Sequence, residues 1–236
     1  MIERPGWLQI VTPSTPGTYQ NEIVFSALEP REVDDVIERE IARCRDENRP
    51  LKWCVGPWTR PADFGERLAR RGFESWDVRG MSIASDAPIA TPDGLDVFTI
   101  EGGEALDRWL RVMLAGWSMP EDQIEAERTS YASALAQTPP AANLFAVRDA
   151  RTDEWLATAG LGANDAYGYL VGGQVLERAR GRGAYRALVA ARLAWLRARS
   201  IPFAVTQARA ATSAPILARL GFATLFEAKC YVLAPS

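Results

Sequence analysis

Residues 167–199 constrain the fold of this chain more than any other part of the sequence. An apolar strand is predicted over residues 167–176, followed by the basic, glycine-rich stretch 177–183 and by a long alanine-rich helix that begins at Ala184. The first N–H groups of a helix have no partner within the helix, and the helix dipole places partial positive charge there. A strand that leads through glycines directly into a helix therefore predicts an anion site.

Three arginines in the glycine-rich stretch indicate that the anion is a phosphate. Arg178, Arg180 and Arg182 would add forked, charged donors where a diphosphate lies. Glycine lets the backbone approach such a ligand without an intervening Cβ. The alternative interpretation is a basic surface turn that binds nothing, and the strand-to-helix context favours the anion site.

The remainder of the chain alternates short strands with amphipathic helices, which predicts an α/β protein. Helices are expected over residues 31–44, 61–71, 104–117 and 121–136, the last ended by Pro139 and Pro140. Residues 85–94 are rich in Pro, Asp and Gly, which is typical of a linker. We therefore expect one domain over 1–85 and a second over 94–236.

One internal repeat supports this division. Residues 67–73, Arg-Leu-Ala-Arg-Arg-Gly-Phe, match residues 216–222, Ile-Leu-Ala-Arg-Leu-Gly-Phe, and each follows a strand and precedes another. The shared order of elements favours two copies of one half-fold over a chance match. We expect Phe73 and Phe222 to be equivalent buried anchors.

With these features the sequence resembles the GNAT (Gcn5-related N-acetyltransferase) superfamily. Its cofactor pattern, Q/R-x-x-G-x-G/A, aligns with residues 180–185, Arg-Gly-Arg-Gly-Ala-Tyr. The pattern also matches residues 178–183 literally, but we prefer the first alignment because it places Gly183 at the helix entry. Tyr185 departs from the Gly or Ala of the family. The resemblance implies a mixed, mostly antiparallel central sheet flanked by helices, with a shortened, degenerate GNAT-like copy over 1–85 and a GNAT acetyltransferase domain over 94–236.

The resemblance also implies that acetyl-CoA, or another acyl-CoA, binds as co-substrate without a metal. In the family, the strand before the glycine turn splays from its neighbour and binds the pantetheine arm like an added strand. Gly172 and Gly173 suit that approach, although they are also typical of a simple bulge. The expected cofactor-binding residues are Gly173, Gln174, Val175, Arg180, Gly181, Arg182, Gly183, Ala184 and Tyr185.

The equivalent junction of the first copy, residues 25–32, predicts no cofactor site. It contains no glycine, and Glu29, Glu32, Asp34 and Asp35 crowd the helix start. Acidic residues there satisfy the helix dipole and would repel a diphosphate. One site per chain follows, and we expect Gly183→Asp to remove binding with little effect on folding.

The catalytic residues remain unassigned by the sequence. The family often places a Tyr four residues before the glycine of its Gly-Phe pair, where this chain has Leu217, and an Asn upstream, where it has Ala210. Neither residue can donate a proton from its side chain. Four other residues are candidates that their spacing does not separate: Tyr167, Tyr169, Glu177 and Tyr231.

Composition excludes several classes of function. The chain has no histidine, which rules out Ser-His-Asp and Cys-His catalysis. Its net charge of −3 is not that of a nucleic-acid-binding domain. The three cysteines are too scattered for a disulfide framework or a zinc site, and no stretch approaches the ~20 apolar residues of a membrane span. We expect a cytoplasmic protein with no membrane partner.

The favoured function is N-acyl transfer to the amine of a small molecule or a peptide. A non-amine acceptor and a non-catalytic acyl-CoA-binding module are the alternatives. Residues 104–140 are expected to select the acceptor. The tryptophans at helical spacing, such as Trp109 and Trp117, are expected in the core. The long helix is expected to place four arginines in a solvated face: Arg186, Arg192, Arg197 and Arg199.

Overall fold

The computed structural model describes residues 1–11, 21–117 and 124–234. The chain forms two compact units. Unit 1 comprises Met1–Gly80, Ala208–Ile216 and Thr224–Ser236, and unit 2 comprises Met81–Gln207 and Leu217–Ala223. The first residues of the helix expected over 121–136 lie outside the described residues.

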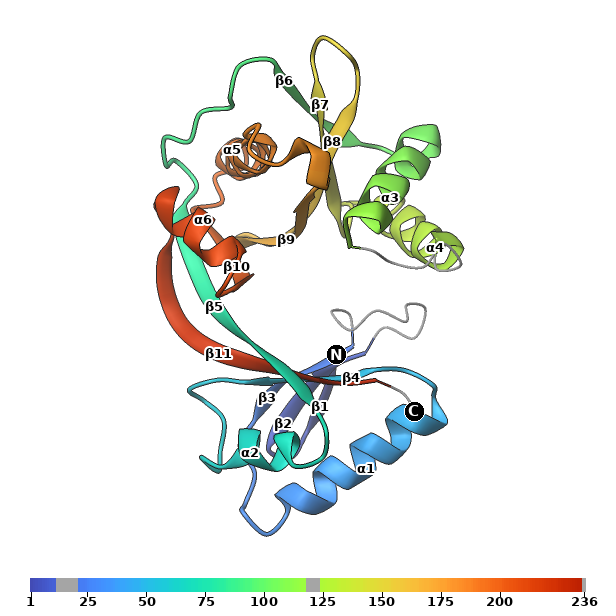
Figure 1. Ribbon diagram of the computed structural model, residues 1–236, viewed down its shortest axis with the longest axis vertical. Helices are drawn as coiled ribbons and strands as arrows, with labels where there is room; N and C mark the ends of the chain where they lie inside the picture. Colours follow the sequence, from blue (N-terminus) through green and yellow to red (C-terminus); the bar gives the residue numbers. More distant parts are fainter. Residues whose placement is uncertain (12–20, 118–123, 235–236) are drawn as a thin grey trace. The chain divides into compact units, whose positions relative to one another are not determined.

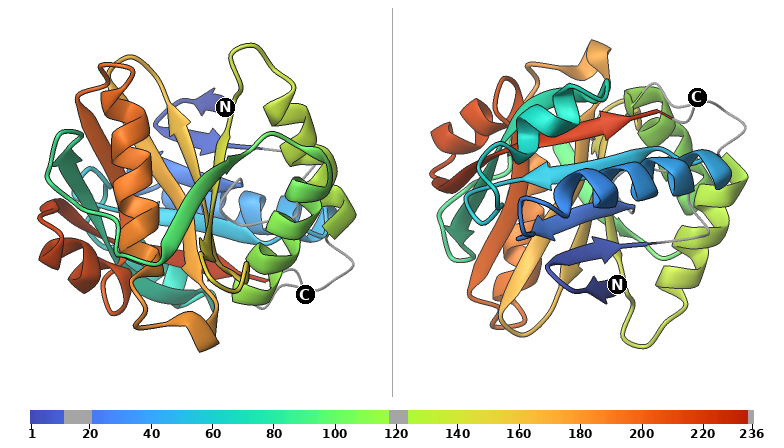
Figure 2. Two further views of the ribbon diagram at one scale, coloured as in Figure 1. Left: turned by 90° about the horizontal axis from the view of Figure 1, so that it is seen from above. Right: turned by 90° about the horizontal axis from the view of Figure 1, so that it is seen from below.

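Unit 1 is built from the early part of the chain and from its last strand. Strands β1, β2 and β3 pair antiparallel, β3 pairs parallel with β4, and β4 pairs antiparallel with β11. Helices α1 and α2 lie on the same face of these strands (Figure 1), and α1 runs along them in the view from below (Figure 2). The elements are β1 (Ile2–Arg4), β2 (Trp7–Ile10), β3 (Glu22–Ser26), α1 (Val33–Asp46), β4 (Leu51–Val55), α2 (Phe64–Ala69), the first part of β5 (Glu74–Ala84) and most of β11 (Ala223–Leu233).

Unit 2 contains most of the remaining elements. Strands β6, β7, β8 and β9 pair antiparallel in sequence order, and β9 pairs parallel with β10. Helix α5 packs on one face of these strands, and α3 with α4 lies on the other (Figure 1). The elements are β6 (Leu95–Ile100), α3 (Gly103–Trp117), α4 (Ile124–Leu135), β7 (Asn143–Asp149), β8 (Trp155–Ala163), β9 (Tyr167–Val175), α5 (Ala184–Arg197) and most of β10 (Phe203–Arg209), while α6 (Ser213–Arg219) is divided between the two units after Ile216.

The helices bury the apolar stripes that the sequence predicts. In α1 the stripe of Val33, Ile37 and Ile41 packs into the core of unit 1. In α3, Trp109 is 2% exposed, and its indole Nε1–H donates to the carbonyl of Phe145 at 2.9 Å. Trp117, at the end of α3, is 41% exposed, so only the first of these two tryptophans is a core residue.

The internal repeat extends to the backbone hydrogen bonds. Gly72 and Gly221 both follow a helix with positive φ, 81° and 97°. The N–H of the following phenylalanine reaches back five residues in each case, to Leu68 from Phe73 at 3.4 Å and to Leu217 from Phe222 at 3.1 Å. This is the left-handed helix end that glycine favours. Both phenylalanines are buried, at 6% and 4% exposure, as predicted.

The order of elements around each Gly-Phe pair is also the same. The series β3-α1-β4-α2-β5 corresponds to β9-α5-β10-α6-β11, and in each series the first two strands pair parallel. The strand that ends each series has 11 residues. The sequence therefore located a repeat of five elements from a match of seven residues.

The compact units differ from the domain ranges expected from the sequence, because the last strand of each repeat lies wholly or partly in the other unit. Strand β11, from the end of the chain, lies next to β4 in unit 1, while the end of β5, Met81–Ala84, belongs to unit 2, where β5 neighbours β10. Each unit thus takes a closing strand from the other repeat. The compact units are therefore discontinuous in sequence, unlike the ranges 1–85 and 94–236, because strand pairing joins segments that are far apart in the chain.

The fold class is the one that the sequence predicts. Most strand pairs among the described residues are antiparallel, β3–β4 and β9–β10 are parallel, and helices flank the strands of both units. Among the described residues, no helix has the length and apolarity that a bilayer crossing requires. None of the three cysteines, all within the described residues, forms a disulfide, and all three are buried.

Candidate functional site

The structure places a β-bulge near the end of β9. Gly172 and Gly173 together face only Ala159 of β8, because the register shifts at this point. Gly172 adopts φ 61°, in the left-handed region that glycine favours. The bulge reading of the two glycines is thus correct, and it interrupts β9 on the side of β8.

On its other side, β9 separates from β10 after a short parallel stretch. The register joins Tyr167–Tyr169 to Phe203–Val205 and ends there. Beyond it, the Thr206 hydroxyl donates to the carbonyl of Leu170 at 2.8 Å. Residues 171–175 form no register pair with β10 in the part of the chain that the structure describes. Their backbone groups on this edge are placed to bind an extended ligand as an added strand.

A side chain at Gly173 would be in tight contact with two residues of α5. A Cβ at this position would lie 3.2 Å from the ring of Tyr185 and 3.4 Å from Nη2 of Arg192, both on α5. The two side chains therefore occupy the space beneath Gly173. The prediction that Arg192 lies in a solvated face is wrong, because its side chain is 1% exposed. Arg186, Arg197 and Arg199 are exposed as predicted.

Gln174 points to the opposite face of the sheet. Its side chain is buried, and its Nε2 donates to the carbonyl of Val112 at 2.8 Å and to the hydroxyl of Thr158 at 2.9 Å. A Cβ on Gly116 of α3 would overlap this amide. Only the backbone of Gln174 is therefore available at the free edge of β9, and its side chain fixes β9 to α3. Val175 ends the strand opposite Ala157.

The chain then turns through a single 3₁₀ turn, Glu177–Ala179, and two left-handed glycines. Gly181 has φ 79°, and a Cβ there would meet no atom within 4 Å. Gly183 has φ 84°, and a Cβ there would lie 2.7 Å from Cγ of Pro92. A Cβ at Gly183 would therefore press on Pro92, which argues against the expectation that Gly183→Asp has little effect on folding; that expectation stays a prediction.

Helix α5 begins at Ala184 with its first turn unprotected. Gly183 is the N-cap and has no side chain to accept a hydrogen bond, and the first turn has no acidic residue. The first hydrogen bond of the helix runs from the N–H of Ala187 to the carbonyl of Gly183 at 3.0 Å. The N–H groups of residues 183–186 therefore lie before the intrahelical ladder and face outward from the turn.

The three arginines of the turn are all paired with carboxylates. Arg178 contacts Glu154 at 2.6 Å, and Arg180 contacts Glu177 at 3.7 Å. Arg182 pairs with Asp149 and lies 4.0 Å from Glu154. The pairs of Arg178 and Arg182 tie the turn to the β7–β8 hairpin, whereas the pair of Arg180 lies within the turn and is exposed.

Asp149 anchors this attachment. It is 5% exposed and accepts hydrogen bonds from the backbone N–H groups of Arg151 at 2.9 Å and Thr152 at 3.3 Å. These backbone donors, together with the guanidinium of Arg182, hold the pKa of Asp149 below its usual range. A charged carboxylate is thus maintained beneath the glycine turn.

The four candidate proton donors are spread over the two units. Leu217, at the position where the family often has a tyrosine, is 1% exposed and apolar, and Tyr231 belongs to unit 1, where it lies against Gly65. Tyr167 and Tyr169 are about half exposed at the far end of β9, and Glu177 is 89% exposed on its side chain. Tyr185 is nearer the bulge, and burial raises its pKa.

The sequence did not identify two buried polar residues, Arg192 on α5 and Glu127 on α4. Arg192 was assigned to the solvent because helical spacing alone does not show which face a sheet covers. Glu127, on α4, is 4% exposed, and burial raises the pKa of its carboxyl. No pattern in the sequence distinguishes Glu127 from the exposed acids around it.

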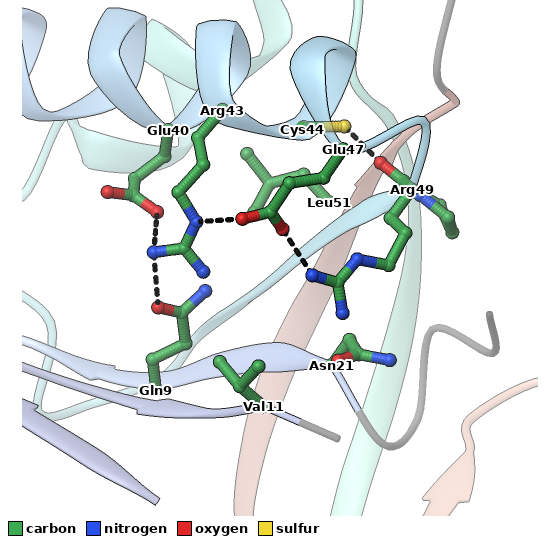
Figure 3. Close-up of a pocket in the computed structure, with 10 residues that line it drawn as sticks. Gln9, Val11, Asn21, Glu40, Arg43, Cys44, Glu47, Arg49 and Leu51 are labelled. Carbon is green, nitrogen blue, oxygen red and sulfur yellow. Dashed lines mark hydrogen bonds and ion pairs between the residues drawn. The ribbon is translucent and has the colours of Figure 1, made fainter. Parts of the chain in front are cut away.

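Unit 1 contains a separate polar pocket (Figure 3). Arg43 bridges Glu40 at 3.4 Å and Glu47 at 3.2 Å, and Arg49 contacts Glu47 at 2.5 Å. Gln9 accepts a hydrogen bond from Arg43 at 3.4 Å. Among the described residues that line this pocket, Arg43 and Arg49 are each paired with a carboxylate, although Nη1 of Arg49 has no hydrogen-bond partner.

Comparison with solved structures identifies the fold. The chain is similar over its full length to a functionally unknown conserved protein from Staphylococcus epidermidis, with 12% identity, 94% of that protein covered and a TM-score of 0.80. It is also similar to a GCN5-related N-acetyltransferase from Kribbella flavida, with 15% identity, coverage of 98% and 91%, and a TM-score of 0.68.

A tandem GNAT protein from the clavulanic acid biosynthesis pathway is similar as well, with 14% identity, coverage of 92% and 75%, and a TM-score of 0.61. No family model and no curated protein matches the sequence. The chain thus has the GNAT fold, at identities that establish the fold alone.

Proposed function

We propose that this protein is an acyl-CoA-dependent N-acyltransferase that transfers an acyl group, acetyl in the simplest case, to an amine. One observation carries the proposal: the free edge of β9 leads directly into the unprotected start of α5. The GNAT fold, found in proteins described as acetyltransferases, supports the same assignment.

The residues of the turn fit a CoA ligand. The backbone N–H groups of Gly183, Ala184 and Tyr185 would hold the diphosphate, since helix geometry leaves them without partners. The backbone of Gly173–Val175 would hold the pantetheine arm along the free edge of β9. A bound acyl-CoA supplies an activated thioester, which an amine can attack without a covalent enzyme intermediate.

The contribution of the protein in this proposal is positioning. The left-handed glycines bring the backbone close to the ligand, and the carboxylate pairs of Arg180 and Arg182 keep the turn in place. Gly181 leaves open space beside the turn. Leu217 cannot donate a proton, so water or a residue other than the usual tyrosine would handle the proton of the leaving group.

The proposal includes one site per chain, within residues 94–236. The range 1–85 is proposed to be a degenerate copy without a cofactor site, and the acceptor amine to be selected by residues 104–140. The cytoplasmic location expected from the sequence stays a prediction.

A non-catalytic acyl-CoA-binding module is the second candidate. The observation that favours it is the apolar, buried Leu217 at the position where the family often has its proton donor. Release of free CoA thiol on incubation of the protein with acetyl-CoA and a panel of amines separates the two, because a binding module releases none. A thiol release that needs a non-amine acceptor would indicate the remaining alternative.

The cofactor site is tested at Gly181, where a side chain has room. We expect Gly181→Asp to weaken acetyl-CoA binding, measured by calorimetry, and Gly181→Asn to retain it. Asn and Asp tolerate left-handed φ better than other side chains and differ here only in charge. Two like charges about 4 Å apart repel by about 4 kcal/mol at an effective dielectric of 20, less in salt, so at least a tenfold loss is expected.

The same titrations give the stoichiometry, which we expect to be one acetyl-CoA per chain. Equal affinities for the Asp and Asn variants, with matching melting temperatures, would move the diphosphate away from this turn. A stoichiometry of two would show that the first repeat also binds CoA.

A further inference from the structure

A buried cation lies beneath the bulge of β9. The guanidinium of Arg192 is 1% exposed, in the middle of α5. Its Nε donates to the carbonyl of Leu188 at 3.0 Å, and its Nη1 donates to the carbonyl of Gly160, on β8, at 3.2 Å. Among the described residues it has no ion pair with a carboxylate, and Tyr185 is the ionisable group that acts on it.

The position of this cation coincides with the free edge of β9. Nη2 of Arg192 is 3.4 Å from the point where a Cβ on Gly173 would lie. Gly173 has no side chain, and the guanidinium of Arg192 and the ring of Tyr185 lie on the face of β9 toward which its Cβ would point, next to the edge that β10 leaves unpaired. In the view from above, α5 lies along β9 (Figure 2).

Stability does not account for a charge at this place. Burial opposes the charged form and lowers the pKa of Arg192 to about 10, which still leaves the side chain a cation at neutral pH. Replacement of buried charges by apolar groups of similar volume is often neutral or stabilising. A buried cation without a carboxylate partner is therefore suited to negative charge that arrives with a ligand or develops during a reaction.

We propose that Arg192 is a positioning residue for acyl transfer, which stabilises negative charge on the thioester sulfur across Gly173. This inference rests on the proposed function. In the transfer, the lone pair of the amine forms the C–N bond, the C–S bond breaks, and its electron pair stays on sulfur. The proton that the amine loses goes to solvent, and the sulfur takes a proton from solvent. Arg192 acts through its electrostatic field, which compensates for the absence of a proton donor at the position of Leu217.

The test measures the thiol of CoA itself, which requires binding but no turnover. CoA is bound to the full-length protein, and its thiol is titrated by thiolate absorbance and by the pH dependence of its alkylation. We expect the thiol pKa to be about one unit lower in the wild-type complex than in Arg192→Met, because a nearby opposite charge favours the ionised form. Arg192→Lys keeps the charge and should recover part of the shift.

Arg197→Met is the matched control, since Arg197 lies on the same helix and is exposed. It should leave the thiol pKa unchanged. In assays with an accepted amine, Arg192→Met should lower kcat at least tenfold with little change in the KM for acetyl-CoA, whereas a residue that only shapes the binding site would change KM.

Each result bears on the inference. Equal thiol pKa values in wild type and in a CoA-binding Arg192→Met variant would overturn the role of Arg192 and leave the proposed function intact. A wild-type protein that does not bind CoA would overturn both. If Arg192→Met does not fold, Arg192→Gln takes its place, and failure of both neutral variants to fold would show that Arg192 is structural.

Discussion

The junctions β3–α1 and β9–α5 occupy equivalent places in the two repeats, yet only the second is open. In both, a strand pairs parallel with the next strand of its repeat over a few residues and then separates from it. Beyond that point β9 carries a free edge. The corresponding edge of β3 is filled by the chain itself.

The segment that follows β4 covers the edge of β3. The indole Nε1–H of Trp58 donates to the carbonyl of Val24 at 3.1 Å, and the N–H of Arg60 donates to the carbonyl of Ser26 at 3.0 Å. The hydroxyl of Ser26 also accepts from Nε1 of the buried Trp53 at 2.6 Å. An added strand would have to displace all of these partners, which makes this edge unsuited to a pantetheine arm.

The two helix starts differ in the same direction. The first turn of α1 contains Asp34 and Asp35, and Asp34 pairs with Arg67 at 2.7 Å and with Arg71 at 2.9 Å. The first turn of α5 has no acid and begins at a glycine. The comparison teaches that the same order of elements forms a ligand site only where the chain leaves its own strand edge and helix start unfilled.

The largest expected effect tests whether the repeats share a structural anchor. Phe73→Ala and Phe222→Ala should each lower the free energy of unfolding by about 3–5 kcal/mol, because both remove a buried ring. Thermal or denaturant unfolding measures the loss. Leu225→Ala is the control, since that side chain is 61% exposed and should change stability by no more than about 0.5 kcal/mol. A melting temperature unchanged by either Phe substitution would contradict the equivalence of the repeats.

Smaller effects should distinguish the edge of β3, which the chain covers, from the free edge of β9. Ser26→Ala leaves the buried indole N–H of Trp53 without its partner and should cost about 1–3 kcal/mol of stability, with no change in acetyl-CoA affinity.

Thr206→Val removes the hydroxyl that holds β10 to Leu170 where the strands separate. It should cost about 1 kcal/mol or less and weaken acetyl-CoA binding. If both variants bind as the wild type does, the edge of β9 has no part in the site.

The smallest effect concerns pH and the attachment of the glycine turn. The pKa of Asp149 is lowered in the folded protein, so its contribution to stability is present above the unfolded value of about 3.9 and is lost as pH falls through the folded pKa. Asp149→Asn should therefore melt below the wild type at pH 7, and the difference should shrink as pH falls below about 4. Asp34→Asn, at a half-exposed carboxylate in the first turn of α1, should change the melting temperature less. A pH-independent difference for Asp149→Asn would contradict the role of its charge.

Much of the candidate site followed from local sequence. The positive φ of Gly181 and Gly183 and the start of the helix at Ala184 depend on glycine and on the residues next to it. The Gly-Phe repeat was found because a left-handed helix end has a strong sequence signature. The acidic, glycine-free junction of the first repeat was likewise visible in the sequence.

The partners of the turn were not predictable in the same way. Arg182 was expected to contact the ligand, and it pairs with Asp149, which is 33 residues away in the chain. The turn is basic in sequence, but its carboxylate partners come from β7 and from the hairpin that follows. The charge pattern of a segment shows which side chains can form ion pairs, but the fold decides which carboxylates they meet.

The sequence by itself determined the local conformations: the glycine turn, the amphipathic helices and the two Gly-Phe helix ends, because these depend on steric limits and hydrogen bonds between residues a few positions apart. Only the tertiary structure decided that Arg192 is buried, that β5 and β11 close the sheets of opposite repeats and that the edge of β3 is filled. These features depend on contacts between segments far apart in the chain, whose pairing is fixed by the packing of the whole sheet and not by the pattern of any one segment.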